Sequence, residues 1–155
     1  MRIAISGHRG LTTETELLVD IEIRGRLSAY SGGDLVGTTC LADGAEQLFA
    51  AAVLDAGGKL EVVVPAKQFR DTLPEASWPT YDALLAKADE VHELDHVEVD
   101  DAALAEAGAA TLEQADRLYA VWDGERKSAP SNVVKLARER DIGVSVIWPE
   151  GAKHH

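Results

Sequence analysis

The chain opens with Met1-Arg-Ile-Ala-Ile-Ser-Gly-His-Arg-Gly10, a short apolar run that breaks into a glycine-rich turn. Two later apolar runs end similarly: residues 34–42 lead into Asp43-Gly-Ala-Glu46, and residues 117–122 lead into Asp123-Gly124. Strands that each end in a small or acidic turn indicate a parallel sheet, whose ligands bind just past the carboxyl ends of the strands. We therefore expect the three turns to face one site.

Outward from these runs, the sequence alternates between apolar strand patterns and helical patterns. The predicted strands cover residues 2–6, 35–41, 59–64, 90–94, 117–122 and 143–148. The predicted helices cover residues 13–30, 44–56, 80–88, 101–115 and 131–140. This alternation predicts a three-layer, Rossmann-like α/β fold with a mainly parallel sheet flanked by helices. The pattern forms one domain over residues 1–150, followed by a C-terminal tail over residues 151–155.

Local signals fix the ends of the helices. Thr13-Glu-Thr-Glu16 has the spacing of a capping box, and Ser31-Gly-Gly33 is expected to end the helix that it begins. The last helix is expected to be capped by Ser128 or Ser131. The buried stripe predicted for the first helix consists of Leu17, Leu18, Ile21 and Leu27.

Composition and charge limit the function classes. The net charge of −12 argues against a general nucleic-acid-binding surface, which needs a basic footprint. No apolar run is long enough to cross a membrane and no signal peptide is evident, so a cytoplasmic location without membrane contact is expected. The single cysteine, Cys40, lies in an apolar run and is expected to be a buried, unreactive thiol.

The first turn, Ser6 to Gly10, is a candidate anion site. Its backbone N–H groups would cradle a phosphate, and Arg9 would pair with that phosphate. A plain βα turn with a surface arginine explains the same residues equally well. His8 is expected to bind the ligand by a hydrogen bond or to be exposed.

The other two turns carry carboxylates. Gly44 would permit close approach of a ligand, and Glu46 would point into the same crevice, although acidic residues favour a first helical turn for dipole reasons alone. Asp123 would meet ribose hydroxyls or cap its own turn. His92 and His96 are four residues apart, but their strand-to-loop context does not favour a metal site, so neither a metal nor a cofactor is expected.

The order of these motifs resembles the SLOG superfamily, which unites the Smf/DprA and LOG proteins. The likeness rests on the opening Ile5-Ser-Gly-His-Arg-Gly10, on Ala42-Asp-Gly-Ala-Glu46, on Ala115–Gly124 and on Val144-Ser-Val-Ile-Trp-Pro149. It implies a Rossmann-like fold that binds a nucleotide or nucleotide-derived ligand across the strand ends. When the family's ligand-binding positions are transferred to the matching motifs of this sequence, and the backbone of Gly10 is added, the expected ligand site comprises Ser6, Gly7, His8, Arg9, Gly10, Gly44, Ala45, Asp123, Gly124, Ser131 and Asn132. Glu46 is the candidate catalytic residue.

The late turn departs from the LOG pattern Pro-Gly-Gly-x-Gly-Thr-x-x-Glu, since residues 123–132 lack its glycines and its glutamate. This favours a sensor-like module that binds a nucleotide or nucleotide-sugar and reports it to a partner. The alternative is an enzyme that cleaves or transfers an N-glycosidic bond, in which Glu46 stabilises an oxocarbenium-like transition state. An interaction protein with a vestigial pocket is a third hypothesis. The alanine-rich helices at 44–56 and 102–115 offer a surface for a homodimer.

Overall fold

The computed structural model describes residues 1–30 and 32–154. The strands are β1 (Arg2–Gly7), β2 (Val36–Thr39), β3 (Lys59–Val64), β4 (Glu90–Glu93), β5 (Arg117–Val121) and β6 (Gly143–Ile147). The helices are α1 (Thr13–Leu27), α2 (Ala45–Asp55), α3 (Trp78–Ala86), α4 (Asp101–Leu112) and α5 (Ala129–Glu139), with short 3-10 turns η1 (Gly32–Asp34), η2 (Arg70–Thr72) and η3 (Glu75–Ser77). Each predicted strand and helix is present, with ends that differ from the prediction by no more than three residues.

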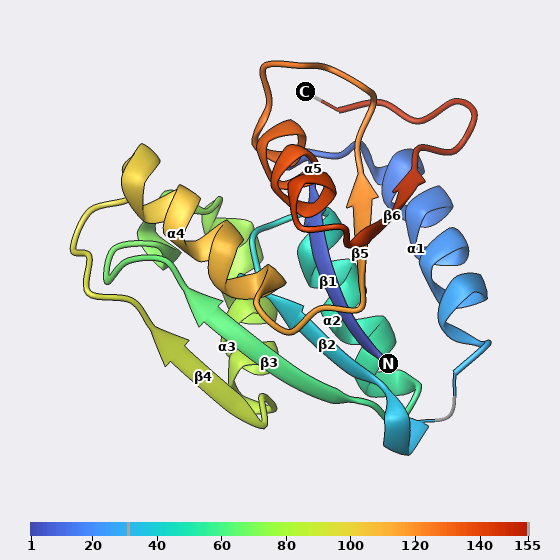
Figure 1. The fold of residues 1–155 in the computed structure, drawn as a ribbon, viewed down its shortest axis with the longest axis horizontal. Helices are drawn as coiled ribbons and strands as arrows, with labels where there is room; N and C mark the ends of the chain where they lie inside the picture. Colours follow the sequence, from blue (N-terminus) through green and yellow to red (C-terminus); the bar gives the residue numbers. More distant parts are fainter. Residues whose placement is uncertain (31, 155) are drawn as a thin grey trace.

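The strands form one sheet in the order β4-β3-β2-β1-β5-β6, and every neighbouring pair is parallel (Figure 1). From β1 the chain winds outward to β4, and α4 then returns it to β5 on the other side of β1. This reversal beside β1 is a topological switch point, where open α/β sheets form their ligand crevice. The predicted three-layer Rossmann-like fold is confirmed.

Helices cover both faces of the sheet (Figure 1). Helices α1 and α2 pack together on one face with α3 beside α2, while α4 and α5 pack together on the other. Successive side chains of β1 point to opposite faces of the sheet. Ile3 and Ile5 therefore join the core under α1 and α2, whereas Ala4 joins the core under α4 and α5.

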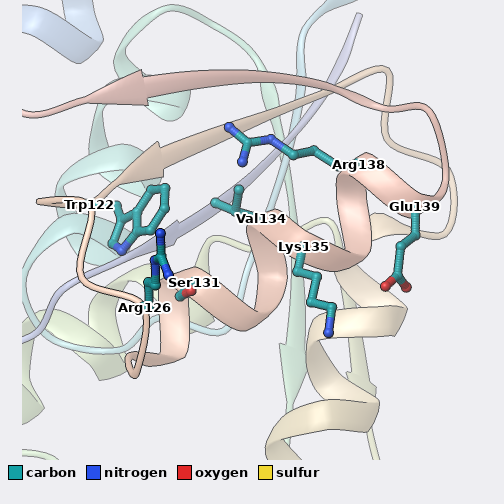
Figure 2. A pocket seen from close by; sticks show the side chains of 7 residues that line it. All are labelled: Trp122, Arg126, Ser131, Val134, Lys135, Arg138 and Glu139. Atoms are coloured by element: carbon teal, nitrogen blue, oxygen red, sulfur yellow. The ribbon is translucent and has the colours of Figure 1, made fainter.

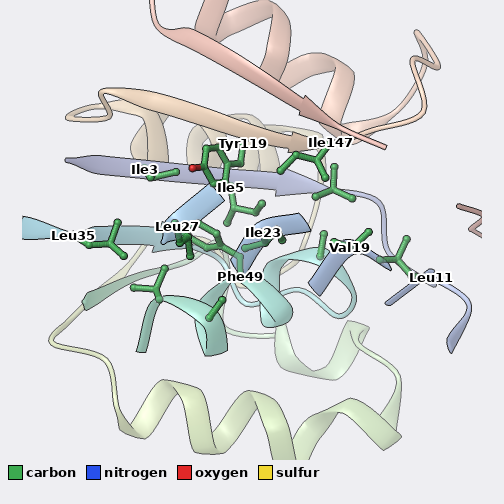
Figure 3. Close-up of a cluster of buried hydrophobic side chains, with 14 residues drawn as sticks. Ile3, Ile5, Leu11, Val19, Ile23, Leu27, Leu35, Phe49, Tyr119 and Ile147 are labelled. Carbon is green, nitrogen blue, oxygen red and sulfur yellow. The ribbon is translucent and has the colours of Figure 1, made fainter. Parts of the chain in front are cut away.

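The largest hydrophobic cluster lies between β1, β5 and the first two helices (Figure 3). Its fully buried side chains include Phe49 from α2 and Ile23 from α1, and Tyr119 of β5 meets Phe49 edge-on at 6.1 Å between ring centroids. Burying a side chain of this size stabilises the fold by roughly 1.5–3 kcal/mol. This layer therefore holds β1 rigidly, with its carboxyl end at the switch point.

Helix α1 is rotated relative to the predicted stripe. Its buried residues are Thr15, Val19, Ile23 and Leu27. Leu17 and Ile21, predicted to be buried, are 63% and 69% exposed, and only Leu27 was assigned correctly to the core. Leu17 and Ile21 are four residues apart, as are Val19 and Ile23, so this spacing alone fits either face of the helix. The β-branched Val19 and Ile23 fill the space against the sheet.

Helix α1 begins at Thr13 as predicted, but its N-cap lies one residue before the predicted capping box. Thr12 is the N-cap, and its hydroxyl accepts a hydrogen bond from the Thr15 amide at 3.2 Å. At the other end the helix stops at Leu27, with Ser28 as C-cap. The predicted Ser31-Gly-Gly33 stop begins at residue 31, outside the described residues.

The C-terminal tail folds back onto the start of α1. The Lys153 amide donates to the Thr15 hydroxyl at 2.7 Å, and the Thr12 amide donates to the Lys153 carbonyl at 3.4 Å. The tail thereby brings His154 next to the first turn, where it forms an isolated antiparallel bridge with Leu11. Among the described residues, none of the helices is both long and apolar enough to cross a membrane.

Candidate functional site

A cavity of about 940 Å³ opens at the carboxyl ends of β1 and β2, at the switch point. The first βα turn and the start of α2 form one side of it, and α4 and the start of α5 form the other. The sequence-predicted residues that line the cavity are Ser6, Gly7, His8, Arg9, Glu46 and Asn132. Of the three turns expected to face one site, the first two contribute residues to this cavity, whereas Asp123 and Gly124 of the third do not.

Six other predicted residues do not line the cavity: Gly10, Gly44, Ala45, Asp123, Gly124 and Ser131. The glycines beside it are required by the protein's own packing. A Cβ on Gly7 would lie 2.4 Å from the Ala45 Cβ, and a Cβ on Gly44 would lie 2.8 Å from the His8 carbonyl oxygen. Gly44 also has φ of 86°, which disfavours other residues. Gly44 thus allows close approach of the first turn, rather than of a ligand, to α2.

Arg9 does not present a free guanidinium. Its Nε donates to Asp43 Oδ1 at 2.6 Å, and its terminal nitrogen donates to the Thr72 carbonyl at 3.0 Å. The Gly10 amide donates to the second oxygen of Asp43 at 3.2 Å. The Asp43 carboxylate therefore occupies the position predicted for a phosphate at Arg9 and Gly10. Arg9 instead joins the first turn to the start of α2.

Glu46 is a half-buried carboxyl group on the cavity wall. Its Oε1 accepts hydrogen bonds from the Cys40 amide at 2.9 Å and from the Thr39 hydroxyl at 3.2 Å. Burial nevertheless dominates these bonds and raises the pKa of Glu46 to about 7. A carboxyl group that titrates near neutral pH in a cavity is suited to proton transfer.

The turn that carries Glu46 is held in a strained conformation. Leu41 follows β2 with φ of 63°, in the left-handed region that leucine rarely adopts, and its side chain is fully buried. Its amide donates to the Thr39 hydroxyl, and its carbonyl accepts from Gln47 at 3.1 Å. Strain of this kind persists only where surrounding contacts fix it, and it is concentrated at functional sites.

The neighbouring thiol was expected to be buried and unreactive, and the structure leaves Cys40 half-buried. Cys40 lies beside Glu46 on the cavity wall, and burial raises the pKa of its thiol well above the ordinary value. A thiol that stays protonated is a poor nucleophile. Glu46 is therefore the better candidate for chemistry on this wall.

Asp123 lies behind the first turn and binds two histidines. Its Oδ1 lies 3.0 Å from His8 Nε2, and its Oδ2 lies 2.8 Å from His154 Nε2. The hydrogen bond with His154 and that from the Glu125 amide lower the pKa of Asp123 to about 2. His8 is only 5% exposed and stacks on His154 with 3.9 Å between ring centroids. Asp123 is thus engaged with protein groups at the place where a ribose was predicted.

The start of α5 forms the opposite wall of the cavity. Ser128 is the N-cap and accepts from the Ser131 amide at 3.3 Å, so the helix begins two residues earlier than predicted. Lys127 and Asn132 line the cavity here, together with Ala105 and Gly108 of α4. The sequence analysis missed Lys127 and the α4 residues. The signal was available, because a cation just before an N-cap adds to the positive end of the helix dipole.

Ser131 lines a second, shallower depression of about 480 Å³ on the outer side of α5. Figure 2 shows Arg126 and Arg138 reaching toward Trp122 and Val134 from different sides, whereas Lys135 and Glu139 point away. Five of the 15 lysines and arginines of this acidic chain fall within residues 126–140, a segment with one acidic residue. Positive charge is therefore concentrated around α5.

No protein-family model matches the sequence, and no curated protein matches it. Solved structures of the same fold do match. The DNA processing protein A (DprA) of Streptococcus pneumoniae has 18% identity and a TM-score of 0.70, over 97% of this chain and 51% of its own length. The DprA of Helicobacter pylori has 13% identity and a TM-score of 0.72, over 99% of this chain and 68% of its own.

A third neighbour is the Moco carrier protein of Chlamydomonas, with 17% identity and a TM-score of 0.59 over 94% of this chain and 74% of its own. This chain spans about half the length of the pneumococcal DprA.

These neighbours overturn one prediction from charge. The net charge was taken to exclude general nucleic-acid binding, yet the Helicobacter DprA structure is described by its single-stranded DNA binding mode. Net charge is a sum over the whole surface, whereas binding depends on local charge, which here is positive around α5. The exclusion was therefore wrong. The fold resemblance expected from the motif order is confirmed: the chain has the Rossmann-like fold of DprA and the Moco carrier protein.

Proposed function

We propose that this chain binds a nucleotide or a nucleotide-derived anion in the strand-end cavity. One observation carries the proposal: the cavity lies at the topological switch point and is lined by both the first βα turn and the start of α5. Its volume of about 940 Å³ falls in the range of small-molecule sites, which is about 300–1,000 Å³.

The anionic group of the ligand belongs at the start of α5. Arg9 and the Gly10 amide are bound to Asp43, so the first turn offers fewer donors than its sequence predicted. Lys127 supplies a positive charge next to the N-cap Ser128, and the helix dipole adds to it. Asn132 can donate from the same wall, and Ser6 faces it from β1.

A thermal-shift screen tests this proposal. The panel contains nucleoside mono-, di- and triphosphates, NAD, ADP-ribose, cyclic dinucleotides and a short single-stranded oligonucleotide. A ligand that binds only the folded chain raises its melting temperature once its concentration exceeds the dissociation constant. If none of these ligands shifts the melting temperature at millimolar concentration, the nucleotide-binding proposal is wrong, and the interaction-protein hypothesis replaces it.

A matched pair of variants locates the binding. Ala105 and Ala102 are both exposed on α4, but only Ala105 lines the cavity. Ala105→Trp is expected to fill part of the cavity and abolish the ligand-induced shift, while Ala102→Trp retains it. Equal shifts in the two variants would place the ligand elsewhere.

Glu46 favours a second candidate, cleavage of an N-glycosidic bond. Its carboxyl lines the cavity, and a pKa of about 7 suits a group that donates or accepts a proton at neutral pH. Turnover of a nucleotide by the wild type, lost in Glu46→Gln with ligand binding retained, would support the enzyme. If the wild-type protein binds its ligand without turnover, the enzyme hypothesis is wrong, and the sensor hypothesis, in which the chain reports the ligand to a partner, is supported.

A further inference from the structure

The outer face of α1 exposes large apolar side chains to solvent. Leu17 and Ile21 are 63% and 69% exposed, which makes them the two most exposed large hydrophobic side chains of the described residues, and Leu18 beside them is 36% exposed. Helix α1 lies at one edge of the molecule (Figure 1), and these side chains lie opposite its buried row. Exposed apolar side chains gathered within a polar surface mark an interaction site.

Two opposite charges flank this apolar pair at equal distances. Glu14 lies three residues before Leu17, and Arg24 lies three residues after Ile21. All four side chains are exposed, and at about 3.6 residues per turn they fall within about a quarter-turn of one another around the helix axis. One side of α1 therefore carries, in order, a negative charge, two apolar side chains and a positive charge.

This order complements itself when two copies of the helix run antiparallel. A two-fold axis through the midpoint between Leu17 and Ile21 places each Leu17 opposite the other copy's Ile21. Glu14 and Arg24 each lie about 7.5 Å along the helix from that midpoint, so both opposite-charge contacts form together. A parallel pair in the same register would instead place like charges opposite each other. We propose that the outer face of α1 packs antiparallel against the same face of a second copy of this chain, in a two-fold symmetric dimer.

Arg24 is held in position for this contact. Its Nε donates to Asp20 Oδ1 at 2.9 Å, and one terminal nitrogen donates to Asp55 Oδ2 at 2.8 Å. Because Asp55 is the last residue of α2, the second bond joins α1 to its neighbour and orders the guanidinium. A guanidinium has five N–H donors, so others remain for a carboxylate of a second copy. A side chain that is already ordered loses less entropy on binding.

The alanine-rich helices from which a homodimer was predicted offer less apolar surface of this kind. Helix α2 carries none of the exposed large hydrophobic side chains found in the described residues. The one on α4, Leu104, lines the strand-end cavity. The outer face of α1 lines neither cavity, so a dimer formed through it leaves the strand-end cavity open and does not depend on a nucleotide.

Sedimentation velocity of the full chain tests the interface. Because the contact is small, the wild type is expected to be monomeric at about 1 μM and to dimerise as its concentration rises to about 1 mM. Ile21→Glu is expected to raise the dissociation constant of the dimer by about tenfold or more. The control is Val97→Glu, which places the same charge on a side chain that is 54% exposed elsewhere, and it is expected to dimerise like the wild type.

An exchange of charges tests the antiparallel register. Glu14→Arg places two arginines opposite each other, and Arg24→Glu places two glutamates opposite each other. Each variant alone is expected to dimerise about tenfold more weakly than the wild type, because like charges then meet twice. An equimolar mixture of the two variants regains both opposite-charge contacts and is expected to dimerise like the wild type, while circular dichroism checks that each variant folds.

Four results would each overturn the proposal. The first is a wild type that stays monomeric at about 1 mM. The second is a dimer that Ile21→Glu leaves intact, and the third is an equal loss in the Val97→Glu control. The fourth is a mixture of Glu14→Arg and Arg24→Glu that dimerises no better than either variant alone.

Discussion

Replacing Glu46 by glutamine removes a carboxyl group that the fold keeps protonated up to about pH 7. The variant is therefore expected to become more stable relative to the wild type as the pH rises. Glutamine keeps the size of the side chain and an oxygen that can accept from the Cys40 amide and the Thr39 hydroxyl. It removes only the charge. The perturbation is therefore confined to the energetic consequence of ionising a half-buried group.

The magnitude follows from the raised pKa. In the unfolded chain Glu46 ionises above its ordinary pKa of 4.5, whereas in the folded chain it keeps its proton up to about pH 7. Between these values the folded state binds more protons, so the free energy of unfolding falls as the pH rises. At about 1.4 kcal/mol for each unit of pKa, the loss reaches about 3 kcal/mol above pH 7 and vanishes below pH 4.5.

Urea denaturation of wild type and Glu46→Gln at pH 4 and pH 8 measures this loss. The difference in unfolding free energy between variant and wild type is expected to be about 3 kcal/mol larger at pH 8 than at pH 4. Glu14→Gln is the control, because Glu14 occupies the first turn of α1 and is exposed. A difference for Glu46→Gln that stays constant with pH, or an equal gain in the control, would refute the reasoning.

Other substitutions test the packing around the site, each by chemical denaturation. Ile23→Ala is expected to lower the free energy of unfolding by roughly 2–5 kcal/mol because Ile23 is fully buried, whereas Ile21→Ala changes it by less than about 0.5 kcal/mol. A larger loss for Ile21→Ala than for Ile23→Ala would show that the face of α1 first predicted from the sequence is the buried one. Gly44→Ala is expected to destabilise the chain by roughly 1–3 kcal/mol, since φ is 86° and the new Cβ would lie 2.8 Å from a carbonyl oxygen. Gly25→Ala, with open space at its Cβ in α1, is expected to stabilise it by about 0.5–1 kcal/mol. Equal effects of the two glycine substitutions would contradict the close contact between the first turn and α2.

The alternating architecture was readable from the sequence because its signals are local. Apolar runs such as Lys59–Val64 have the length of buried strands, and glycines or acidic residues follow several of them. The rule of right-handed crossovers adds that the strands are parallel with helices on the faces of the sheet, but the strand order with its reversal beside β1 came only from the structure. The rotation of α1 was not readable, since Leu17 and Val19 are equally apolar and only the shape of the sheet decides which is buried.

Part of the site depends on contacts between residues far apart in the chain, which the spacing of motifs in the sequence does not predict. Arg9 and Asp43 are 34 residues apart, and their ion pair replaces the predicted contact between Arg9 and a phosphate. His8 and Asp123 are 115 residues apart and meet because β1 and β5 are neighbours. Once that pairing is known, the carboxyl ends of both strands must lie together. The position of His154 depends further on the docking of the tail against Thr12 and Thr15.

Ligand binding in the strand-end cavity is tested most directly by amide chemical shifts in ¹H–¹⁵N spectra, recorded with and without the nucleotide that gives the largest thermal shift. The perturbed amides are expected to cluster in residues 6–9 and 127–133, on the two walls of the cavity. Perturbations confined to the exposed strand β4 or the outer face of α1, or none at saturating ligand, would contradict it.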